Sequence, residues 1–259
     1  MGKEVKRYKF GRRDLLNMYI LGIETTTPIM SIALSEDEKL LEEVSENCEN
    51  SQVVKIIPKI DHILKKNKLS LSQIGLVGVD IGPGMFTGTR IGLTVAKTFS
   101  QVNSIDIVGI TSSHALAYQA MKLIYQLKNE NIQNEELCIL PLINAKREEV
   151  YCSFFTCKNS TLNKICEDEL IKIDELEQKV FKLIGMYKKI ILCGNILIDY
   201  LFISSKFEKE EKVTIFRNVI IPKANAINIL AFQKYSKEAI DDYIKLNPIY
   251  VRKFKPFGK

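Results

Sequence analysis

The turn from Gly82 to Gly84 has the composition of an anion-binding loop. It follows the apolar run Ile74–Val79 and leads directly into a helical pattern. Glycine permits a positive φ and lets other atoms approach the backbone, and a glycine-rich turn that opens a helix presents free N–H groups. One interpretation is a weak nucleotide or anion site made by Gly82 and Gly84 with Glu24 and Thr25 of an earlier turn. The other is that the loop only turns the chain.

Two familiar nucleotide-binding motifs are excluded at this loop. No Gly-Lys-Ser/Thr follows at the spacing of a P-loop, and the third glycine comes too late for a dinucleotide fingerprint. The earlier turn, Glu24–Pro28, contains three threonines and no glycine, which is unfavourable for a close phosphate cradle. We therefore expect weak nucleotide binding at most, no required cofactor, and no catalytic residue in this chain.

A stripe of small residues runs along the predicted helix Phe86–Gln101. Its members recur every four residues and so share one face: Gly88, Gly92, Ala96 and Ser100. Glycine inside a helix costs roughly 0.5–1 kcal/mol relative to alanine, so a compensating close approach is expected. The stripe packs either on the protein's own sheet and the helix Ser51–Lys66, or on a helix of a partner chain. We adopt the partner interface, with Arg90 as a charged contact beside it.

The helix Ser51–Lys66 has a wider apolar arc than packing on one sheet requires. We expect part of it to join the same partner interface, through Val53, Ile56, Ile60 and Ile63. Replacing Gly92 by leucine should then abolish partner binding while the monomer stays folded.

Histidine and cysteine offer little support for catalysis or metal binding. Only two histidines are present, His62 and His114, and no Ser, Cys or acid is placed to form a nucleophile triad with His62. Six cysteines occur without any C-x-x-C pair, so a structural zinc site is not expected. We expect free thiols in a reducing cytoplasm.

Periodicity predicts an α/β protein in two halves. The predicted strands of the first half are Tyr19–Ile23, Ile29–Leu34, Lys39–Ser45, Ile74–Val79 and Ile105–Gly109. Its predicted helices are Ser51–Lys66, Phe86–Gln101 and Ser112–Leu127. The short connections between the first three strands require an antiparallel meander.

The second half is patterned more weakly. Its predicted strands are Cys138–Ile143, Val150–Thr156 and Lys189–Cys193, and its predicted helices are Asp174–Ile184 and Lys223–Ser236. We divide the chain into four parts on this basis: a disordered extension at 1–17, an N-terminal lobe at 18–128, a C-terminal lobe at 129–252 and a basic tail at 253–259.

Positive charge is concentrated at the two ends of the chain. The net charge is +6, yet residues 1–13 hold six Lys or Arg and one Glu, and residues 245–259 hold five Lys or Arg and no acid. Such ends either attract RNA phosphates without sequence preference or are merely solvated. No run approaches the roughly 20 apolar residues needed to cross a bilayer, so neither membrane insertion nor secretion is expected.

Several motifs in sequence order resemble one protein family. The segment GPGMFTGTRIGLTVAKTF resembles the signature G-P-G-S-F-T-G-x-R-I-G-x-x-x-A-K-G of the TsaB family, also called YeaZ, with Met85 and Thr98 as departures. Weaker resemblances follow the family order: Leu21–Thr25, Ser51–Pro58, Gly109–Ala117, Ile143–Tyr151 and Pro248–Arg252. In the fourth of these, Asn144, Lys146 and Glu148 replace the family's Asp, Arg and Gly.

The resemblance implies the fold of actin-like ATPases and sugar kinases (ASKHA), with two similar lobes of mixed sheet flanked by helices. It also implies a non-catalytic scaffold that binds and activates the larger paralogue TsaD, together with the ATPase TsaE. This complex forms threonylcarbamoyladenosine next to the tRNA anticodon. The chain would form a homodimer when alone, contact tRNA only through the complex, and place ATP or ADP, where bound, at the partner interface.

Comparison with that paralogue supports a non-catalytic role. The resemblance implies that the paralogue holds its metal with an H-x-x-x-H helix, where this chain has only His114, flanked at four residues by Ile110 and Tyr118. A single histidine does not anchor a catalytic metal at this spacing. The alternative is a free-standing ATP-dependent kinase or carbamoyl transferase on the same fold, which would depend on Glu24 and the Gly82–Gly84 loop.

Overall fold

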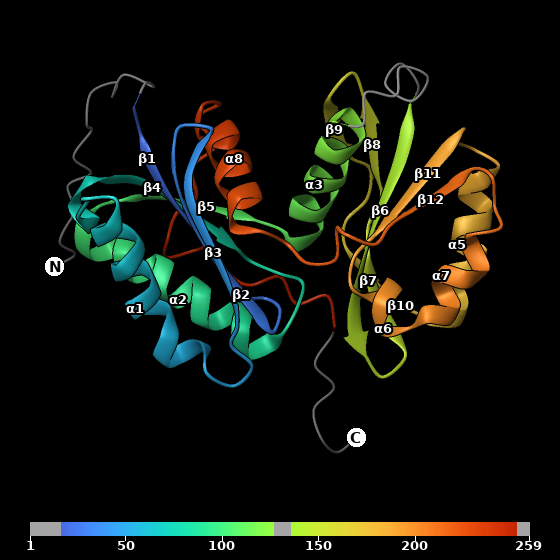
Figure 1. Ribbon diagram of the computed structural model, residues 1–259, viewed down its shortest axis with the longest axis horizontal. Coiled ribbons are helices and arrows are strands. Elements are labelled where there is room, and N and C mark those ends of the chain that lie inside the picture. The colour runs from blue at the N-terminus through green and yellow to red at the C-terminus, as the bar shows by residue number, and fades with distance from the viewer. Residues whose placement is uncertain (1–16, 127–135, 253–259) are drawn as a thin grey trace, which may run out of the picture.

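The strands of the two predicted halves form two mixed sheets, which stand side by side (Figure 1). This computed structural model describes residues 17–126 and 136–252, so the extension and the basic tail predicted from the sequence lie outside the described residues, apart from Asn17. Helices cover the outer face of each sheet, and two further helices lie between the sheets. The predicted α/β class is confirmed.

The first sheet has the strand order β3-β2-β1-β4-β5. Its strands are β1 (Tyr19–Glu24), β2 (Ile29–Glu36), β3 (Lys39–Asn47), β4 (Ile74–Asp80) and β5 (Asp106–Ile110). The first three form the predicted antiparallel meander, and β4 lies parallel to both β1 and β5. Every residue of β4 is buried, as its continuous apolar pattern predicts for a strand covered on both faces.

One face of this sheet is covered by α1 (Gln52–Lys66) and α2 (Phe86–Asn103), which lie on the outside of the molecule (Figure 1). Both helices begin within one residue of the predicted position. Their apolar sides enter a core that also contains Leu21, Val77 and Val79 of the sheet. A short 3-10 helix, η1 (Leu71–Gln73), leads from α1 into β4.

The opposite face of the first sheet is covered by α8 (Ala224–Tyr235), which comes from the far end of the chain. Asn228 is fully buried, and its amide donates to the carbonyl oxygens of Ile20 and Ala33. At Gly22 an added Cβ would lie 2.5 Å from the carbonyl oxygen of Ala224, so the helix approaches the strand too closely for any side chain there. A division of the chain at residue 128 therefore does not separate the two sheets with their helices.

After α8 the chain continues along the first lobe. The main-chain N–H of Asp241 donates to Ile107 at the free edge of β5, and the N–H of Ile249 donates to Ile81. We call residues 241–252 the C-terminal strap. It ends at Arg252, whose guanidinium donates to the carbonyl oxygen of Ala145 in the second lobe.

The second sheet has the order β10-β7-β6-β11-β12, with β8 paired to β6 and β9 paired to β8. Its strands are β6 (Leu137–Lys146), β7 (Glu149–Cys152), β8 (Phe155–Lys158), β9 (Thr161–Lys164), β10 (Glu169–Lys172), β11 (Lys189–Cys193) and β12 (Val213–Phe216). Its outer helices are α5 (Ile173–Ile184), α6 (Ile196–Asp199) and α7 (Leu201–Phe207). The predicted run Val150–Thr156 spans the end of β7 and the start of β8, which are separate strands.

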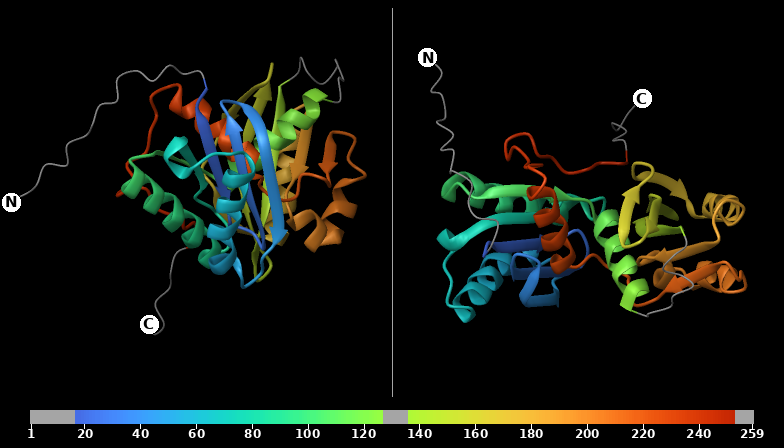
Figure 2. Two further views of the ribbon diagram at one scale, coloured as in Figure 1. Left: turned by 60° about the vertical axis from the view of Figure 1, so that its left-hand side comes forward. Right: turned by 90° about the horizontal axis from the view of Figure 1, so that it is seen from above.

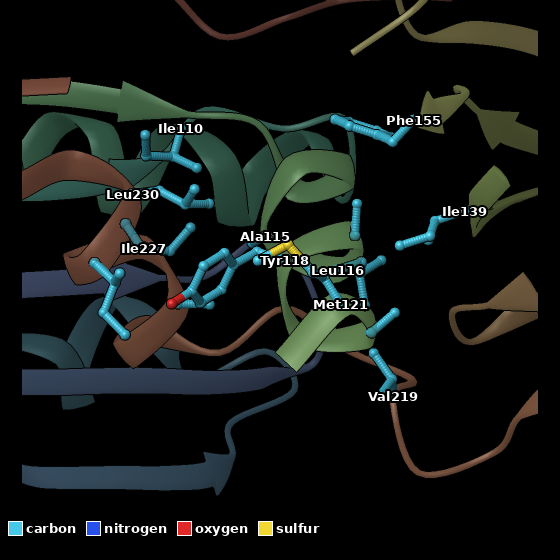
Figure 3. Close-up of a cluster of buried hydrophobic side chains, with 14 of the residues drawn as sticks. Ile110, Ala115, Leu116, Tyr118, Met121, Ile139, Phe155, Val219, Ile227 and Leu230 are labelled. Carbon is cyan, nitrogen blue, oxygen red and sulfur yellow. The ribbon is translucent and has the colours of Figure 1, made fainter. Parts of the chain in front are cut away.

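Helix α3 (Ser112–Gln126) lies between the two sheets and beside α8 (Figure 2). Its buried side chains contact both lobes (Figure 3): Tyr118 points toward Ile227 of α8, whereas Leu116 and Met121 face Ile139 and Val219. One apolar core therefore joins the two lobes through α3.

The described residues give no sign of a membrane segment or a metal centre. No helix among them combines the length and apolar character needed to cross a bilayer. Within the same ranges, no group of three or more His, Cys, Asp and Glu side chains is arranged to hold a metal ion. All six cysteines are free thiols, five of them buried, and burial raises the pKa of Cys138 and Cys152 to about 12.

Candidate functional site

The threonine turn after β1 holds the starts of both outer helices. The hydroxyl of Thr25 donates to the carbonyl oxygen of Gly88 in α2, at 2.7 Å. The carbonyl oxygen of Thr26 accepts from the main-chain N–H of Met85, at 2.7 Å. The carbonyl oxygen of Thr27 accepts from the side-chain amide of Gln52, the first residue of α1, also at 2.7 Å. Three successive residues thus fix α1 and α2 relative to the sheet.

The small-residue stripe of α2 faces this turn and the protein's own sheet. An added Cβ at Gly88 would lie 2.0 Å from the carbonyl oxygen of Thr25, and one at Gly92 would lie 2.3 Å from the Thr25 hydroxyl. Ala96 and Ser100 are buried below them. The prediction that Gly88, Gly92, Ala96 and Ser100 contact a partner chain is wrong in this structure, because the compensating close approach is made within the chain.

The apolar arc of α1 divides into an inner and an outer face. Ile56, Ile60 and Ile63, which we predicted at the partner interface, are buried in the core against the first sheet. Val53 is 66% exposed, and its neighbours Val54 and Ile57 are 70% and 48% exposed. We call these three residues the outer face of α1. Of the four residues predicted on this helix, only Val53 is available to a partner.

Arg90 lies on the exposed side of α2, where it contacts the C-terminal strap. Its guanidinium carbon is 3.6 Å from the centre of the Phe86 ring, and its Nε donates to the hydroxyl of Tyr250 at 2.7 Å. Phe86 and Tyr250 are each about half exposed and have ring centres 5.4 Å apart. Arg90 therefore joins α2 to the strap and leaves an aromatic surface beside the outer helices.

Two carboxyl groups are enclosed beneath the threonine turn. Glu24 ends β1, Asp80 ends the neighbouring parallel strand β4, and both have no exposed surface. One oxygen of Glu24 accepts from the N–H and hydroxyl of Thr26, each at 2.6 Å. One oxygen of Asp80 accepts from the N–H of Gly82 at 2.8 Å and from the hydroxyl of Ser112 at 2.7 Å.

Burial dominates the electrostatics of this pair. Desolvation and the negative charge of Asp80 raise the pKa of Glu24 well above its usual range. Burial raises the pKa of Asp80 to about 7, against the effect of its hydrogen bonds. Asp80 was not predicted from the sequence as a site residue. The available signal was its position at the carboxyl end of a strand parallel to the one that ends in Glu24.

The same geometry gives no support to an anion site at Glu24, Thr25, Gly82 and Gly84. An added Cβ at Gly84 would lie 2.6 Å from the carbonyl oxygen of Thr26, so its free space is occupied by the chain. Gly82 has φ of 92° in the turn. An anion would also meet two acidic side chains with no cation bonded to either in the described residues. The glycines serve the turn and its close contact with Thr26.

The second-lobe turn between β6 and β7 explains one family departure. The amide of Asn144 donates to the carboxylate of Asp199 at 2.6 Å, and its own N–H donates to Asn195 at 2.8 Å. An aspartate at position 144, as the family pattern has it, would place two carboxylates in contact. Asn144 and Asp199 are therefore a matched pair in this chain.

Glu148 is a departure without such compensation, and we expect Glu148→Gly to stabilise the protein by about 0.5–1 kcal/mol. Glu148 is exposed and has φ of 57° in a turn where Lys146 and Arg147 are also left-handed. Glycine adopts this conformation without the Cβ strain. Urea denaturation measures the gain, and Glu175→Gly in α5 is the control, because there the same exchange should destabilise by about 1 kcal/mol. An equal loss at both positions would contradict the argument.

The fold and the sequence comparisons define the class of protein. Residues 44–241 match the family described as TsaD, tRNA N6-adenosine threonylcarbamoyltransferase. The structure resembles YeaZ from Pseudomonas aeruginosa with a TM-score of 0.69, at 16% identity over 90% of this chain and 99% of that one. It also resembles a polyphosphate/ATP-glucomannokinase from Arthrobacter with a TM-score of 0.50, at 10% identity over 86% and 100% of the two chains. The chain is therefore an actin-like, ASKHA-type protein related to the threonylcarbamoyltransferases.

A sequence relative identifies the family within that class. The tRNA threonylcarbamoyladenosine biosynthesis protein TsaB of Buchnera aphidicola subsp. Schizaphis graminum is 32% identical over 225 residues, which cover 85% of this chain and 96% of the relative. The chain belongs to the TsaB family, also called YeaZ, and takes part in tRNA threonylcarbamoyladenosine biosynthesis. The predicted family and actin-like fold are confirmed.

Proposed function

We propose that this chain is a non-catalytic subunit that binds and activates a TsaD-type threonylcarbamoyltransferase through the exposed sides of α1 and α2. The observation that carries this proposal is the outer face of α1. Val53, Val54 and Ile57 place three exposed aliphatic side chains on a helix whose start is fixed by the threonine turn. Exposed apolar clusters on a rigid element are typical of protein interfaces.

The enclosed carboxyl pair supports a role without catalysis by this chain. Glu24 and Asp80 lie at the carboxyl ends of neighbouring parallel strands, where ligands commonly bind in α/β folds. Here both are closed to solvent by the chain itself. In the proposed function the transferase supplies the reacting groups, a TsaE-type ATPase completes the assembly, and ATP or ADP occupies the partner interface. This chain forms a homodimer when alone, works in the cytoplasm and contacts tRNA through the complex.

Size-exclusion chromatography with light scattering tests the proposal directly. The chain alone should elute as a homodimer, and an equimolar mixture with a TsaD-type transferase should give a single heteromeric species, with and without ATP. Separate elution at concentrations far above 1 µM would contradict the proposed partnership.

An ATPase assay on the isolated chain distinguishes the proposed non-catalytic subunit from the alternative, a free-standing enzyme. We expect no turnover above that of a Glu24→Ala variant. Turnover by the purified chain that is lost in Glu24→Ala would instead favour a free-standing enzyme.

A further inference from the structure

Among the described residues, no Lys, Arg or His side chain is bonded to either carboxyl group of the enclosed pair. Each carboxylate has one oxygen in good hydrogen bonds, whereas Glu24 Oε2 is buried with no partner among the described residues. Asp80 Oδ2 lies 3.4 Å from the hydroxyl of Thr26, which is 2.6 Å from Glu24 Oε1. Like charges this close in a buried site are strongly unfavourable, and the usual result is that one group stays neutral.

The hydrogen bonds provide a path through Thr26 by which one proton links Asp80 Oδ2 to Glu24 Oε1. With Asp80 protonated, its Oδ2 hydroxyl can donate to Thr26 Oγ1, and the hydroxyl proton of Thr26 is donated to Glu24 Oε1. The hydroxyl of Ser112 then donates to Asp80 Oδ1. Groups coupled in this way titrate as a pair, so the proton belongs to the cluster and not to one residue.

Charged groups on the surrounding elements have other partners. Examples are Glu43 on β3, Arg90 on α2, His114 on α3, Lys223 before α8, Lys234 on α8, and Asp241 and Arg252 of the C-terminal strap. None of them is bonded to Glu24 or Asp80 where the structure describes the chain. Burial also lowers the pKa of His114 to about 4, so this imidazole is neutral at pH 7. The charge of Asp168 adds to the repulsion felt by Asp80.

The pair sits under the turn that positions the two outer helices. Thr26 contributes its N–H and hydroxyl to Glu24 and its carbonyl oxygen to Met85 at the start of α2. Its neighbours Thr25 and Thr27 bond to α2 and α1. A second negative charge in the cluster would repel the ends of β1 and β4 from each other, and the displacement would pass through Thr26 to both helices.

We propose that Glu24 and Asp80 share a single proton, and that loss of this proton loosens the threonine turn and with it the placement of α1 and α2. The device belongs to the isolated chain and does not depend on the proposed partner. The direction of the pH dependence of stability follows from the raised pKa values, because the folded state keeps a proton that the unfolded state releases near pH 4. The contribution of this proton to stability is therefore full below about pH 4 and is lost as pH rises through the raised folded pKa of the pair, which lies at about 7 for Asp80 and well above its usual range for Glu24.

Denaturation of the full chain as a function of pH provides the first test. For one such group, the folding equilibrium constant should fall about tenfold per pH unit between pH 5 and 7. In Asp80→Asn this loss should shrink, so the variant becomes more stable relative to wild type as pH rises. Glu24→Gln should have the same effect and serves if Asp80→Asn folds poorly. Asp61→Asn, which removes the same charge from an exposed position of α1, should leave the pH curve parallel to that of wild type.

Infrared spectroscopy of the wild-type chain detects the proton without relying on a variant's stability. A carboxylic-acid C=O band should be present at pH 6 and absent from the Glu24→Gln/Asp80→Asn double variant. Hydrogen exchange should show protection of Met85 falling with pH while that of Ile191 in the second sheet does not. A wild-type chain without the acid band at pH 6, or pH curves that remain parallel in both single variants, would overturn the proposal.

Discussion

Replacing Val53 and Ile57 together by glutamate is expected to weaken binding of a TsaD-type transferase by about 100-fold or more, while the monomer keeps its stability. Both side chains are about half exposed or more, and neither belongs to the core of the first sheet. In the free chain the new carboxylates stay in water. In the complex they would be desolvated without a partner, at a cost of several kcal/mol. Isothermal titration calorimetry measures the affinity, and urea denaturation the stability.

The control for this variant places the same two charges on another exposed apolar surface. Ile165 and Met186 of the second lobe are 56% and 65% exposed. Their double replacement by glutamate should leave the affinity within about threefold of wild type, as expected for substitutions outside an interface. If both double variants bind as tightly as wild type, the partner does not use the outer face of α1.

The second large effect is expected at Gly92, where leucine should destabilise the fold by more than about 3 kcal/mol. The first added atom would lie 2.3 Å from the Thr25 hydroxyl and 3.3 Å from the side chain of Ile23. To relieve this steric clash, α2 must move away from β1, and this movement breaks the hydrogen bond between Thr25 and Gly88. The midpoint of urea denaturation measures the loss.

This result bears on how any partner-binding defect is interpreted. A Gly92→Leu chain that fails to bind a partner would report a misplaced helix and not a lost contact. Thr94→Leu, on the exposed side of the same helix, is the matched control and should change stability by no more than about 0.5 kcal/mol. A Gly92→Leu variant as stable as this control would contradict the close packing of α2 on β1.

The elements of the first lobe were predictable because their signals are local. The helices α1, α2 and α3 have clear 3.6-residue periodicity, and the meander follows from connections too short for any other arrangement. The elements of the second lobe were harder to predict from the sequence. Strands β9, β10 and β12 have four residues each, as does helix α6, and windows this short carry little periodic information.

The candidate site was only partly predictable, because periodicity states which residues share a face but not what covers it. The stripe on α2 was predicted from its spacing. Whether the turn at Thr25 or a partner chain covers Gly88 could not be predicted, because it depends on a long-range contact. The same limit applies to Ile56, Ile60 and Ile63 on α1. Asp80 becomes a candidate site residue only through the parallel pairing of β1 and β4, which places it beside Glu24. The position of α8 likewise depends on its contact with a sheet that begins some 200 residues earlier in the sequence.

The return of α8 to the first sheet has a consequence for synthesis of the protein. During translation, strands β1 to β5 emerge long before the helix that covers one of their faces, and the whole second lobe is made in between. Until residues 224–235 leave the ribosome, the surface around Gly22 and Ala33 has no cover, and Ile20 and Ala33 lack their bonds to Asn228. We expect the second lobe to become protease-resistant on the nascent chain before the first, which reverses the usual order in which domains mature from the N-terminus.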